Sequence, residues 1–454
     1  MKAPVHQRGS AVLLLVPLLA CSGGPGQDAV APPSDTEADS DTDVDVDADP
    51  DTGWDEGELT VLRGQDALAG GVGVGVKGFG GSECGDWIMP GEPGEVLVHC
   101  GDPWSGSSTG GLLHRVDGAA LLSGTPTVLA TLSGVYVGHG QANGGMSDLD
   151  GDALGELGVR NATDGGLNLG YVVPGSAWAG DTALEDVAWR LVGDSGYVGL
   201  APQVVADADG DGTADLLVVQ ETDSYVDDSS VGSRLILIPG ASLVGTQSSA
   251  TVLVLRIGSY VIEGTRGLGA PGVIGGVGDV DGDGLEDLGV AFGPWSEPGL
   301  DQSGDVRIVL STTLGAVTLD DCPSVTGVLS GRLLESALVR LGDLDGDGRS
   351  ELAVGFVKDD DTGSDSRRLE FGVVNGASIA PATTTVIAPW EADLQDYSGV
   401  GCDLDGDGLP EWVSADGIWS GGSLSTTAVA IGPGVDAIGC LGDLDGDGVQ
   451  ELGL

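Results

Sequence analysis

The sequence predicts an all-β fold, and three observations support that expectation. Short runs rich in Val and Leu alternate with turns rich in Gly and Asp, and the chain contains 82 glycines. No segment after the N-terminus has a helical period, although 41% of the residues are hydrophobic. One acidic loop pattern occurs six times. Short β-rich runs between turns, repeated along a chain, are typical of an all-β repeat protein.

The charge limits the partners. The 454 residues include 71 Asp and Glu but only 17 Lys and Arg, a net charge of −54. Such a surface repels nucleic acid and anionic lipid headgroups and attracts cations. We therefore expect no nucleic-acid partner.

The N-terminus has the form of a targeting segment. Lys2 and Arg8 precede an apolar run, residues 11–20, that is too short to span a bilayer as a helix. The run ends at Leu18-Leu19-Ala20-Cys21 and resembles a bacterial lipobox. That resemblance implies a signal peptide at residues 1–20, a lipid-modified Cys21 and a lipid anchor as the sole membrane attachment. The alternative is an ordinary secretory signal with a chance Cys.

By the same resemblance, Ser22 in place of Asp after the Cys favours the outer membrane. We therefore expect a bacterial outer-membrane lipoprotein, periplasmic or surface-exposed. Residues 21–57 follow, and within them acids nearly alternate with other residues from Ser34 to Asp49. Repulsion between such charges extends a chain, so we interpret this segment as a disordered tether. A cation-binding tract is the alternative, but no Gly turn or strand frames these acids.

Residues 58–454 contain six loops with acids at positions 1, 3, 5 and 9, which we number 1 to 6 in chain order. They are Asp148-Leu-Asp150-Gly-Asp152-Ala-Leu154-Gly-Glu156, Asp207-Ala-Asp209-Gly-Asp211-Gly-Thr213-Ala-Asp215, Asp279-Val-Asp281-Gly-Asp283-Gly-Leu285-Glu-Asp287, Asp343-Leu-Asp345-Gly-Asp347-Gly-Arg349-Ser-Glu351, Asp403-Leu-Asp405-Gly-Asp407-Gly-Leu409-Pro-Glu411 and Asp443-Leu-Asp445-Gly-Asp447-Gly-Val449-Gln-Glu451. A short apolar run follows each loop.

These residues fit calcium, which takes about six to eight oxygen ligands. Acids at positions 1, 3 and 5 of a turning loop converge on one point, and the acid at position 9 closes the shell. Position 7 offers its backbone carbonyl, so its side chain varies. Ligands that are all oxygen argue against zinc or copper. We therefore predict about six calcium ions, with loop 1 the least secure because Ala153 replaces Gly at position 6.

Two alternatives fit the loops less well. An EF-hand needs an acid at position 12 and flanking helices, whereas position 12 here is Val, Leu or Ser and a strand follows. Six polar turns that only solvate the surface are the other alternative, but six copies with one spacing argue against chance.

The spacing of the loops predicts a seven-bladed β-propeller with four-stranded blades. Six junctions between blades carry loops, and a seventh, degenerate junction lies at residues 86–95, where Ile88 and Pro90 replace two acids. We expect no calcium there. One C-terminal strand and three N-terminal strands would complete a shared blade, leaving no open edge.

Five cysteines remain if Cys21 is lipidated, and an exported chain permits disulfides. Cys84 and Cys100 flank the degenerate junction and are the first candidate pair. Cys402 and Cys440 are a weaker candidate pair, and Cys322 would then be the odd thiol.

The loops and the apolar runs after them, seen at Asp343 to Val354 and Asp279 to Val290, resemble the FG-GAP repeats of integrin α-subunits and the related bacterial VCBS repeats. The resemblance covers residues 58–454. It implies a calcium-rigidified propeller with its ions on one face and a binding surface elsewhere.

Two functions remain open. The first is a surface-anchored, non-catalytic binding or adhesion module for a protein or glycan, acting as a monomer. The alternative is a polysaccharide lyase or hydrolase on the same propeller. His99 and His114 fall in expected strands, and the scarcity of basic residues disfavours a lyase for acidic glycans. We therefore expect no enzyme, although a pair of catalytic carboxylates stays open.

Overall fold

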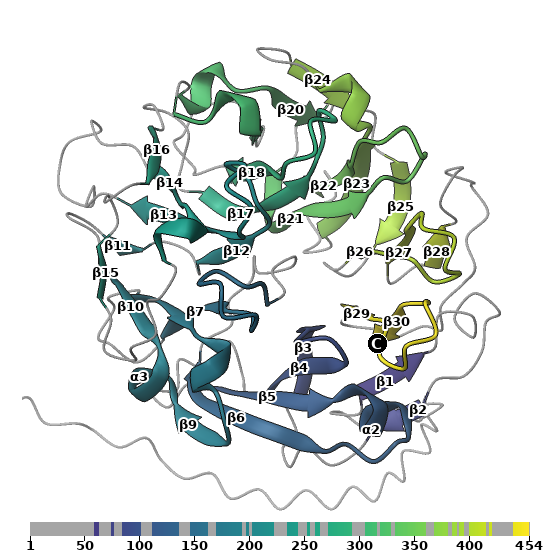
Figure 1. Ribbon diagram of the computed structural model, residues 1–454. Coiled ribbons are helices and arrows are strands. Elements are labelled where there is room, and N and C mark those ends of the chain that lie inside the picture. The colour runs from purple at the N-terminus through teal and green to yellow at the C-terminus, as the bar shows by residue number, and fades with distance from the viewer. Residues whose placement is uncertain are drawn as a thin grey trace, which may run out of the picture. The chain divides into compact units, whose positions relative to one another are not determined.

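Short strands, mostly antiparallel, dominate the protein, which we describe from a computed structural model (Figure 1). The structure describes residues 59–62, 74–76, 84–100, 111–135, 146–161, 169–192, 197–198, 202–221, 234–243, 252–254, 259–263, 271–292, 305–315, 318–327, 332–359, 367–379, 384–387, 390–394, 399–414, 417–419 and 439–453. The expected signal peptide, Cys21 and the tether lie outside these residues. The all-β class is confirmed.

The described strands pair into seven sheets, which we number 1 to 7. Sheet 1 holds β3 (Cys84–Pro90), β4 (Glu95–Cys100), β5 (Gly111–Asp117), β6 (Val128–Val135) and β9 (Asp181–Ala183). Sheet 2 holds β7 (Leu157–Asn161), β8 (Leu169–Val173), β10 (Trp189–Val192) and β15 (Val252–Val254). Sheet 3 holds β11 (Tyr197–Val198), β12 (Gln203–Val205), β13 (Asp215–Glu221), β14 (Arg234–Ile238) and β16 (Tyr260–Glu263).

Sheet 4 holds β17 (Pro271–Gly278), β18 (Asp287–Phe292), β19 (Asp305–Val309), β20 (Ser324–Gly327) and β24 (Thr384–Ile387). Sheet 5 holds β21 (Arg332–Gly342), β22 (Glu351–Asp359), β23 (Arg367–Val374) and β25 (Trp390–Leu394). Sheet 6 holds β26 (Gly399–Cys402), β27 (Glu411–Ser414) and β28 (Gly417–Trp419). Sheet 7 holds β29 (Gly439–Gly442), β30 (Glu451–Gly453), β1 (Leu59–Leu62) and β2 (Val74–Val76).

Helices are few and short in the described residues. They are α2 (Gly118–Leu122), α3 (Leu184–Val187) and the 3-10 helices η1 (Gly175–Ala177), η2 (Gly240–Ser242), η3 (Ser311–Thr313), η4 (Leu319–Asp321) and η5 (Gly376–Ser378). No helix among the described residues is long and apolar enough to cross a membrane. Helices η1, η2, η3 and η5 each follow the strand that comes after a loop's own strand, a position that matters below.

The strands have continuous apolar runs because neighbouring sheets cover both of their faces. On β8, Val172 packs with residues of sheet 3, while Val173 packs with residues of sheet 1. Residues 215–220 of β13 are all buried. Val and Ile suit such positions, since branched side chains pack well on a pleated surface.

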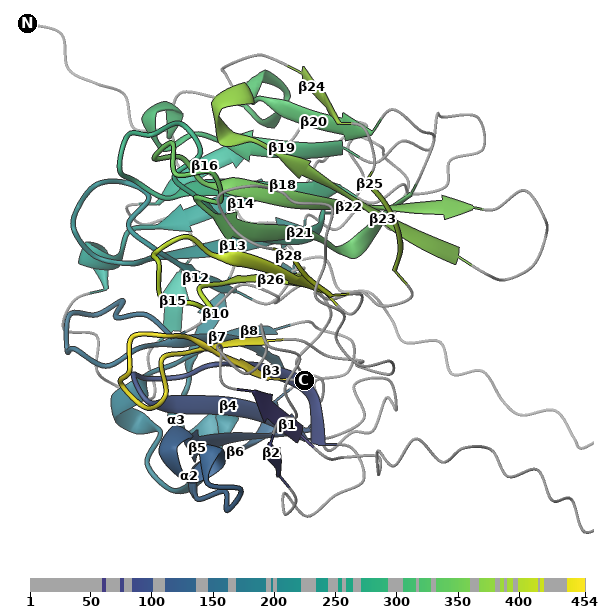
Figure 2. The ribbon, with the colours of Figure 1, turned by 90° about the vertical axis from the view of Figure 1, so that its right-hand side faces the viewer.

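Each sheet packs against the next in chain order. Shared apolar clusters join sheet 1 to sheet 2, sheet 2 to sheet 3, sheet 3 to sheet 4 and sheet 4 to sheet 5. Figure 2 shows strands of sheets 3, 4 and 5 lying side by side. Strand β21 contacts β26, and clusters join sheet 6 to sheet 7 and sheet 7 to sheet 1.

The expected arrangement of strands around the loops was wrong. Loops 2 to 6 connect two consecutive strands that pair in one sheet, such as β12 and β13, rather than one blade to the next. The apolar run before a loop therefore pairs with the run after it. The sheet that joins the chain ends takes two strands from each end, β29 and β30 with β1 and β2, instead of one and three. The sheets hold three to five described strands, not uniformly four.

The degenerate junction is shorter than expected. Strand β3 extends to Pro90, because Ile88 and Met89 are buried core residues, so Asp86 lies in the strand. A tight turn at residues 91–94 then leads into β4, with Gly94 at φ 80°. Where the other sheets have a nine-residue acidic loop, sheet 1 has this turn.

Cysteine pairing was predicted in part. A disulfide joins Cys402 of sheet 6 to Cys440 of sheet 7, with 5.5 Å between the Cα atoms. Cys322 is a buried free thiol, as expected. Cys100 is disulfide-bonded, and the backbone of Cys84 lies directly opposite it in the register of β3 and β4. The Cys84–Cys100 pair stays a prediction that this register supports.

Glycines on the strands nearest a neighbouring sheet permit close backbone contact, which gives a test of the packing. A Cβ on Gly158 of β7 would lie 1.9 Å from the carbonyl oxygen of Pro202, just before β12, whereas a Cβ on Gly275 of β17 meets nothing within 4 Å. We expect Gly158→Ala to lower the free energy of unfolding by more than about 2 kcal/mol. Urea denaturation measures it, with Gly275→Ala as the control. Equal effects of the two variants would contradict the packing.

Candidate metal sites

All six loops share one hydrogen-bond pattern at position 1. The carboxylate there accepts from the backbone N–H groups of positions 4 and 6 and so folds the loop around itself. In loop 2, Asp207 Oδ1 accepts from Gly210 N at 2.7 Å, and Asp207 Oδ2 accepts from Gly212 N at 2.8 Å. The same pair of bonds recurs at Asp148, Asp279, Asp343, Asp403 and Asp443.

The backbone reaches this shape through positive φ angles at positions 4 and 6. In loop 2, Gly210 has φ 80° and Gly212 has φ 90°, a region that glycine reaches without steric cost. Loop 1 has Ala153 at position 6, and this residue adopts φ 69°, the one non-glycine with positive φ in the described residues. Loop 1 therefore has the same turn as the others, with some backbone strain.

The acid at position 9 joins three parts of its sheet. In loop 2, Asp215 Oδ2 accepts from Ala208 N at position 2, and Asp215 Oδ1 accepts from Gly240 N at the start of η2, both at 2.9 Å. Glu156, Asp287 and Glu351 make the equivalent bonds to Gly175, Ser311 and Gly376 at the starts of η1, η3 and η5. This acid thus fixes its loop to the turn after the next strand.

The position-9 acids are fully buried, from 0% to 2% exposed in all six loops. Burial is the largest cause that raises the pKa of these carboxyls, to about 7 for Glu156, Asp287 and Glu451 and to about 6 for Asp215, with the pKa of Glu351 also raised. Neighbouring acids of the same loop add to the effect. Several close carboxylates without a counter-charge disfavour one another's ionised forms, so a cation would be favoured here.

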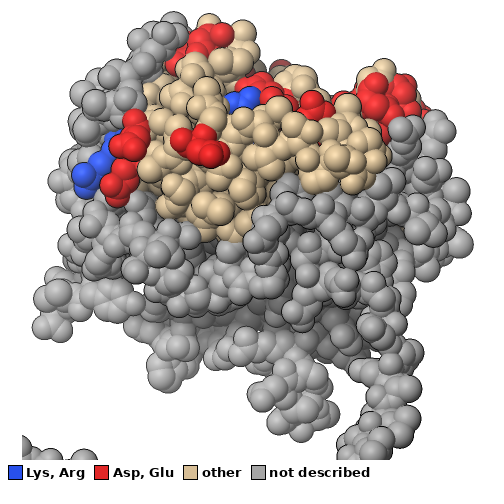
Figure 3. Space-filling model, turned by 90° about the horizontal axis from the view of Figure 1, so that it is seen from below, with Lys and Arg blue, Asp and Glu red and all other residues tan. Residues whose placement is uncertain are grey.

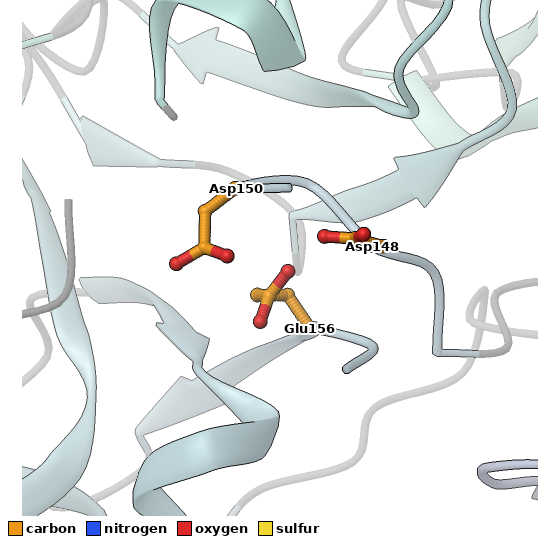
Figure 4. Close-up of side chains that lie close together, drawn as sticks. All are labelled: Asp148, Asp150 and Glu156. Atoms are coloured by element: carbon orange, nitrogen blue, oxygen red, sulfur yellow. The ribbon is translucent and has the colours of Figure 1, made fainter. Parts of the chain in front are cut away.

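The chemistry of the donor set fits a hard divalent cation. Three acids of one loop offer oxygen atoms that lie within 4.8 Å of one another in loops 1, 2, 3 and 5 (positions 1, 3 and 9) and in loop 4 (positions 1, 3 and 5). Figure 4 shows the carboxylates of Asp148, Asp150 and Glu156 turned toward a common space. The Oδ2 atom of Asp150 is buried without a hydrogen-bond partner in a residue that is 2% exposed. An unpaired buried carboxylate oxygen is costly, and a bound cation would satisfy it.

The predicted site residues divide into two groups. The acids at positions 1, 3, 5 and 9 lie in their loops as expected. In loops 3 to 6 the side chain at position 7 lies against the preceding loop, as with Leu285 of loop 3 against Gly210 of loop 2. Sequence reasoning missed position 2, whose apolar side chain is 0% to 5% exposed in all six loops, and the small residue, Gly or Ser, whose N–H donates to position 9 in loops 1 to 4. Both recur in the sequence, so their repetition was the available signal.

Three pairs of successive loops are joined through position 8, whereas position 8 of loop 5 is Pro410, which has no N–H to donate. The backbone N–H at this position donates to the carbonyl of position 1 in the preceding loop, from Glu286 to Asp207 at 3.0 Å and from Gln450 to Asp403 at 2.9 Å. Ser350 makes the same bond to Asp279 at 2.6 Å. Gly155 of loop 1 donates to the Glu92 carboxylate in the turn of sheet 1. Neighbouring loops therefore lie on the same side of their sheets.

Histidine does not build a second candidate site in the described residues. His99 on β4 and His114 on β5 are buried, as expected for strand residues, and they face opposite sides of sheet 1 by the strand register. Burial, with His114 nearby, lowers the pKa of His99 to about 4. His114 Nδ1 lies 3.2 Å from the Thr131 hydroxyl. On the face in Figure 3, the described surface carries acidic side chains at several places and basic ones at few.

Comparisons with known proteins identify no family for the chain. No family model matches the chain, and no curated protein matches it. Among solved structures, the crystal structure of polysaccharide lyase Uly1 is similar, with a TM-score of 0.37 and 12% sequence identity over 83% of this chain and 89% of that one. A likeness at this TM-score carries no argument about activity.

Two variants of loop 1 separate the structural role of position 9 from cation binding. Glu156→Gln puts an amide group opposite the Leu149 or Gly175 N–H, so it should lower the free energy of unfolding by about 1–3 kcal/mol in EGTA, and by more in calcium because Glu156 is also a proposed ligand. Asp150→Asn keeps the acceptor for Asp152 N and replaces the unpaired oxygen. It should reduce stability in calcium and not in EGTA. Thermal denaturation in both buffers measures this, and a loss for Asp150→Asn in EGTA would contradict the assignment.

Proposed function

We propose that residues 58–454 form a closed, seven-bladed β-propeller of the FG-GAP/VCBS type. Seven sheets and the contact of each with the next, from sheet 7 back to sheet 1, support the ring. The pairing of β1 with β30 supports closure, since it joins the two ends of the chain in one sheet. Hydrogen bonds across the sheet then take the place of an open edge.

We propose further that the six loops bind calcium through the acids at positions 1, 3, 5 and 9. The observation that carries this proposal is the buried, unpaired Asp150 oxygen in a group of three converging carboxylates. Oxygen donors from several carboxylates suit calcium better than transition metals. The ion would supply charge neutralisation and hold the loop. The protein's own residues place the acids, bury position 9 and fix the loop to the turn that follows.

As a function, we propose a calcium-stabilised binding or adhesion module for a protein or glycan, attached to the bacterial outer membrane through Cys21. Two observations support a role without catalysis. The recurring acids of loops 1 to 5 all take part in hydrogen bonds of the loop itself, as at Asp209 and Asp211 of loop 2, and the buried histidines of sheet 1 face opposite sides. The ligand would then bind a surface other than the loops.

Removal of calcium tests the structural role of the ions. A ligand at about 100 times its Kd adds about 2.7 kcal/mol per site, so several occupied loops should raise the melting temperature by more than about 10 °C. We expect excess EGTA to abolish this gain and added calcium, but not magnesium, to restore it. Differential scanning calorimetry measures the transition. An unchanged melting curve in EGTA would contradict the proposal.

A binding assay separates a binding module from an enzyme. The calcium-loaded protein, applied to arrays of glycans and surface proteins, should be retained by a subset of them without releasing reducing ends or unsaturated sugars. Retention should weaken in EGTA, because the ions stabilise the fold. Turnover of a retained glycan that disappears on mutation of acids outside the loops would instead favour the lyase or hydrolase.

A further inference from the structure

In loops 3 to 6, the side chain at position 7 covers part of the preceding loop. A Cβ on Gly210 of loop 2 would lie 3.4 Å from Leu285 Cδ1 of loop 3. A Cβ on Gly346 of loop 4 would lie 3.8 Å from Leu409 Cδ2 of loop 5, and one on Gly406 of loop 5 would lie 3.3 Å from Val449 Cγ2 of loop 6. In these three pairs an apolar side chain rests on the position-4 glycine of the preceding loop.

Loop 3 is different because the side chain that covers it is a positively charged arginine. A Cβ on Gly282 would lie 3.4 Å from Arg349 Nε, 3.5 Å from Arg349 Cγ and 3.8 Å from Arg349 Cζ. The guanidinium of loop 4 therefore lies against the glycine between Asp281 and Asp283, two of the proposed calcium ligands. Arg349 is partly buried, so the solvent screens its charge less than that of a fully exposed side chain.

The electrostatic effect on loop 3 is direct. Burial and the neighbouring acids Asp283 and Asp279 raise the pKa of Asp281, and Arg349 acts in the opposite direction. The same positive charge that favours the ionised carboxylate repels a divalent cation bound to it. Loop 3 therefore has a partial counter-charge of its own, which the apolar covers of loops 2, 4 and 5 do not supply.

We propose that Arg349 determines the cation affinity of loop 3 and makes it weaker than that of loops 2, 4 and 5. The inference rests on the proposed calcium function and goes beyond it, because it ranks the sites. Among loops 2 to 5, loop 3 fills last as calcium rises and empties first as calcium falls. Since the position-9 acid Asp287 fixes loop 3 to η3 through Ser311, sheet 4 is the part of the chain whose stability follows the calcium concentration most closely.

The test exchanges the covering side chains at position 7 between loops in the full-length chain. Arg349→Leu gives loop 3 the cover that loop 2 has, and Leu285→Arg gives loop 2 the cover that loop 3 has. Arg349→Lys keeps the charge. Arg190→Leu is the control. It changes the net charge by the same amount, at an exposed position of β10 in sheet 2 rather than next to loop 3. Titration of calcium against a chromophoric chelator gives the individual affinities, and circular dichroism confirms that each variant is folded.

For Arg349→Leu we expect one weak calcium site to bind on the order of 10-fold more tightly, a gain that shrinks as NaCl is raised. Arg349→Lys and Arg190→Leu should leave that site near its original affinity. Leu285→Arg should create a second weak site. If calcium binds but Arg349→Leu changes no affinity by more than about twofold, the ranking is wrong while the calcium function stands. If the unmodified protein binds no calcium, both proposals fail.

Discussion

The interaction on which the described architecture depends is the double hydrogen bond of the position-9 carboxylate. One oxygen accepts from position 2 of its own loop, and in loops 1 to 4 the other accepts from the turn after the next strand. Buried backbone N–H groups need an acceptor. In loops 1 to 4 this acid accepts from two such groups, which lie in turns and not in paired strands. A neutral side chain of this size offers only one acceptor oxygen, so the chain keeps a carboxylate in an apolar setting.

A buried carboxylate at position 9 favours the binding of a cation. Burying a carboxylate is costly unless its charge is balanced, and few basic residues are available in a chain with 17 Lys and Arg. Three more acids surround each position-9 acid, and in loop 1 one of their oxygens has no partner. A divalent ion would offset both costs. The fold of the loop, the burial of its position-9 acid and the charge of its carboxylates therefore depend on one another, and this arrangement recurs in six sheets.

The sequence was sufficient for the loops and insufficient for the strands around them. Equal spacing of acids and glycines predicted the turn. Loop 1, expected to be the least secure because of Ala153, adopts the same turn with Ala153 at φ 69°. The apolar runs on either side of a loop look alike, so nothing in their composition said that they pair with each other rather than with strands of adjacent sheets. The predicted start of each sheet was therefore displaced by one strand. For the same reason the sheet that joins the chain ends was expected to take one and three strands, whereas it takes two from each end, β29 and β30 with β1 and β2. The Cys402–Cys440 bond was foreseen as the weaker pair. The position of Arg349 depends on how loops abut, which spacing alone does not reveal.

The number of ions bound tests the central claim most directly. The full-length protein would be equilibrated with calcium, passed through a metal-free desalting column and analysed by inductively coupled plasma mass spectrometry against its amino-acid content. If the loops are calcium sites, about six calcium ions per chain should be found for the six loops, falling by about one when the position-1 and position-3 acids of a single loop are replaced by Asn. A calcium content near zero, or one that does not change when a loop loses its acids, would contradict the claim.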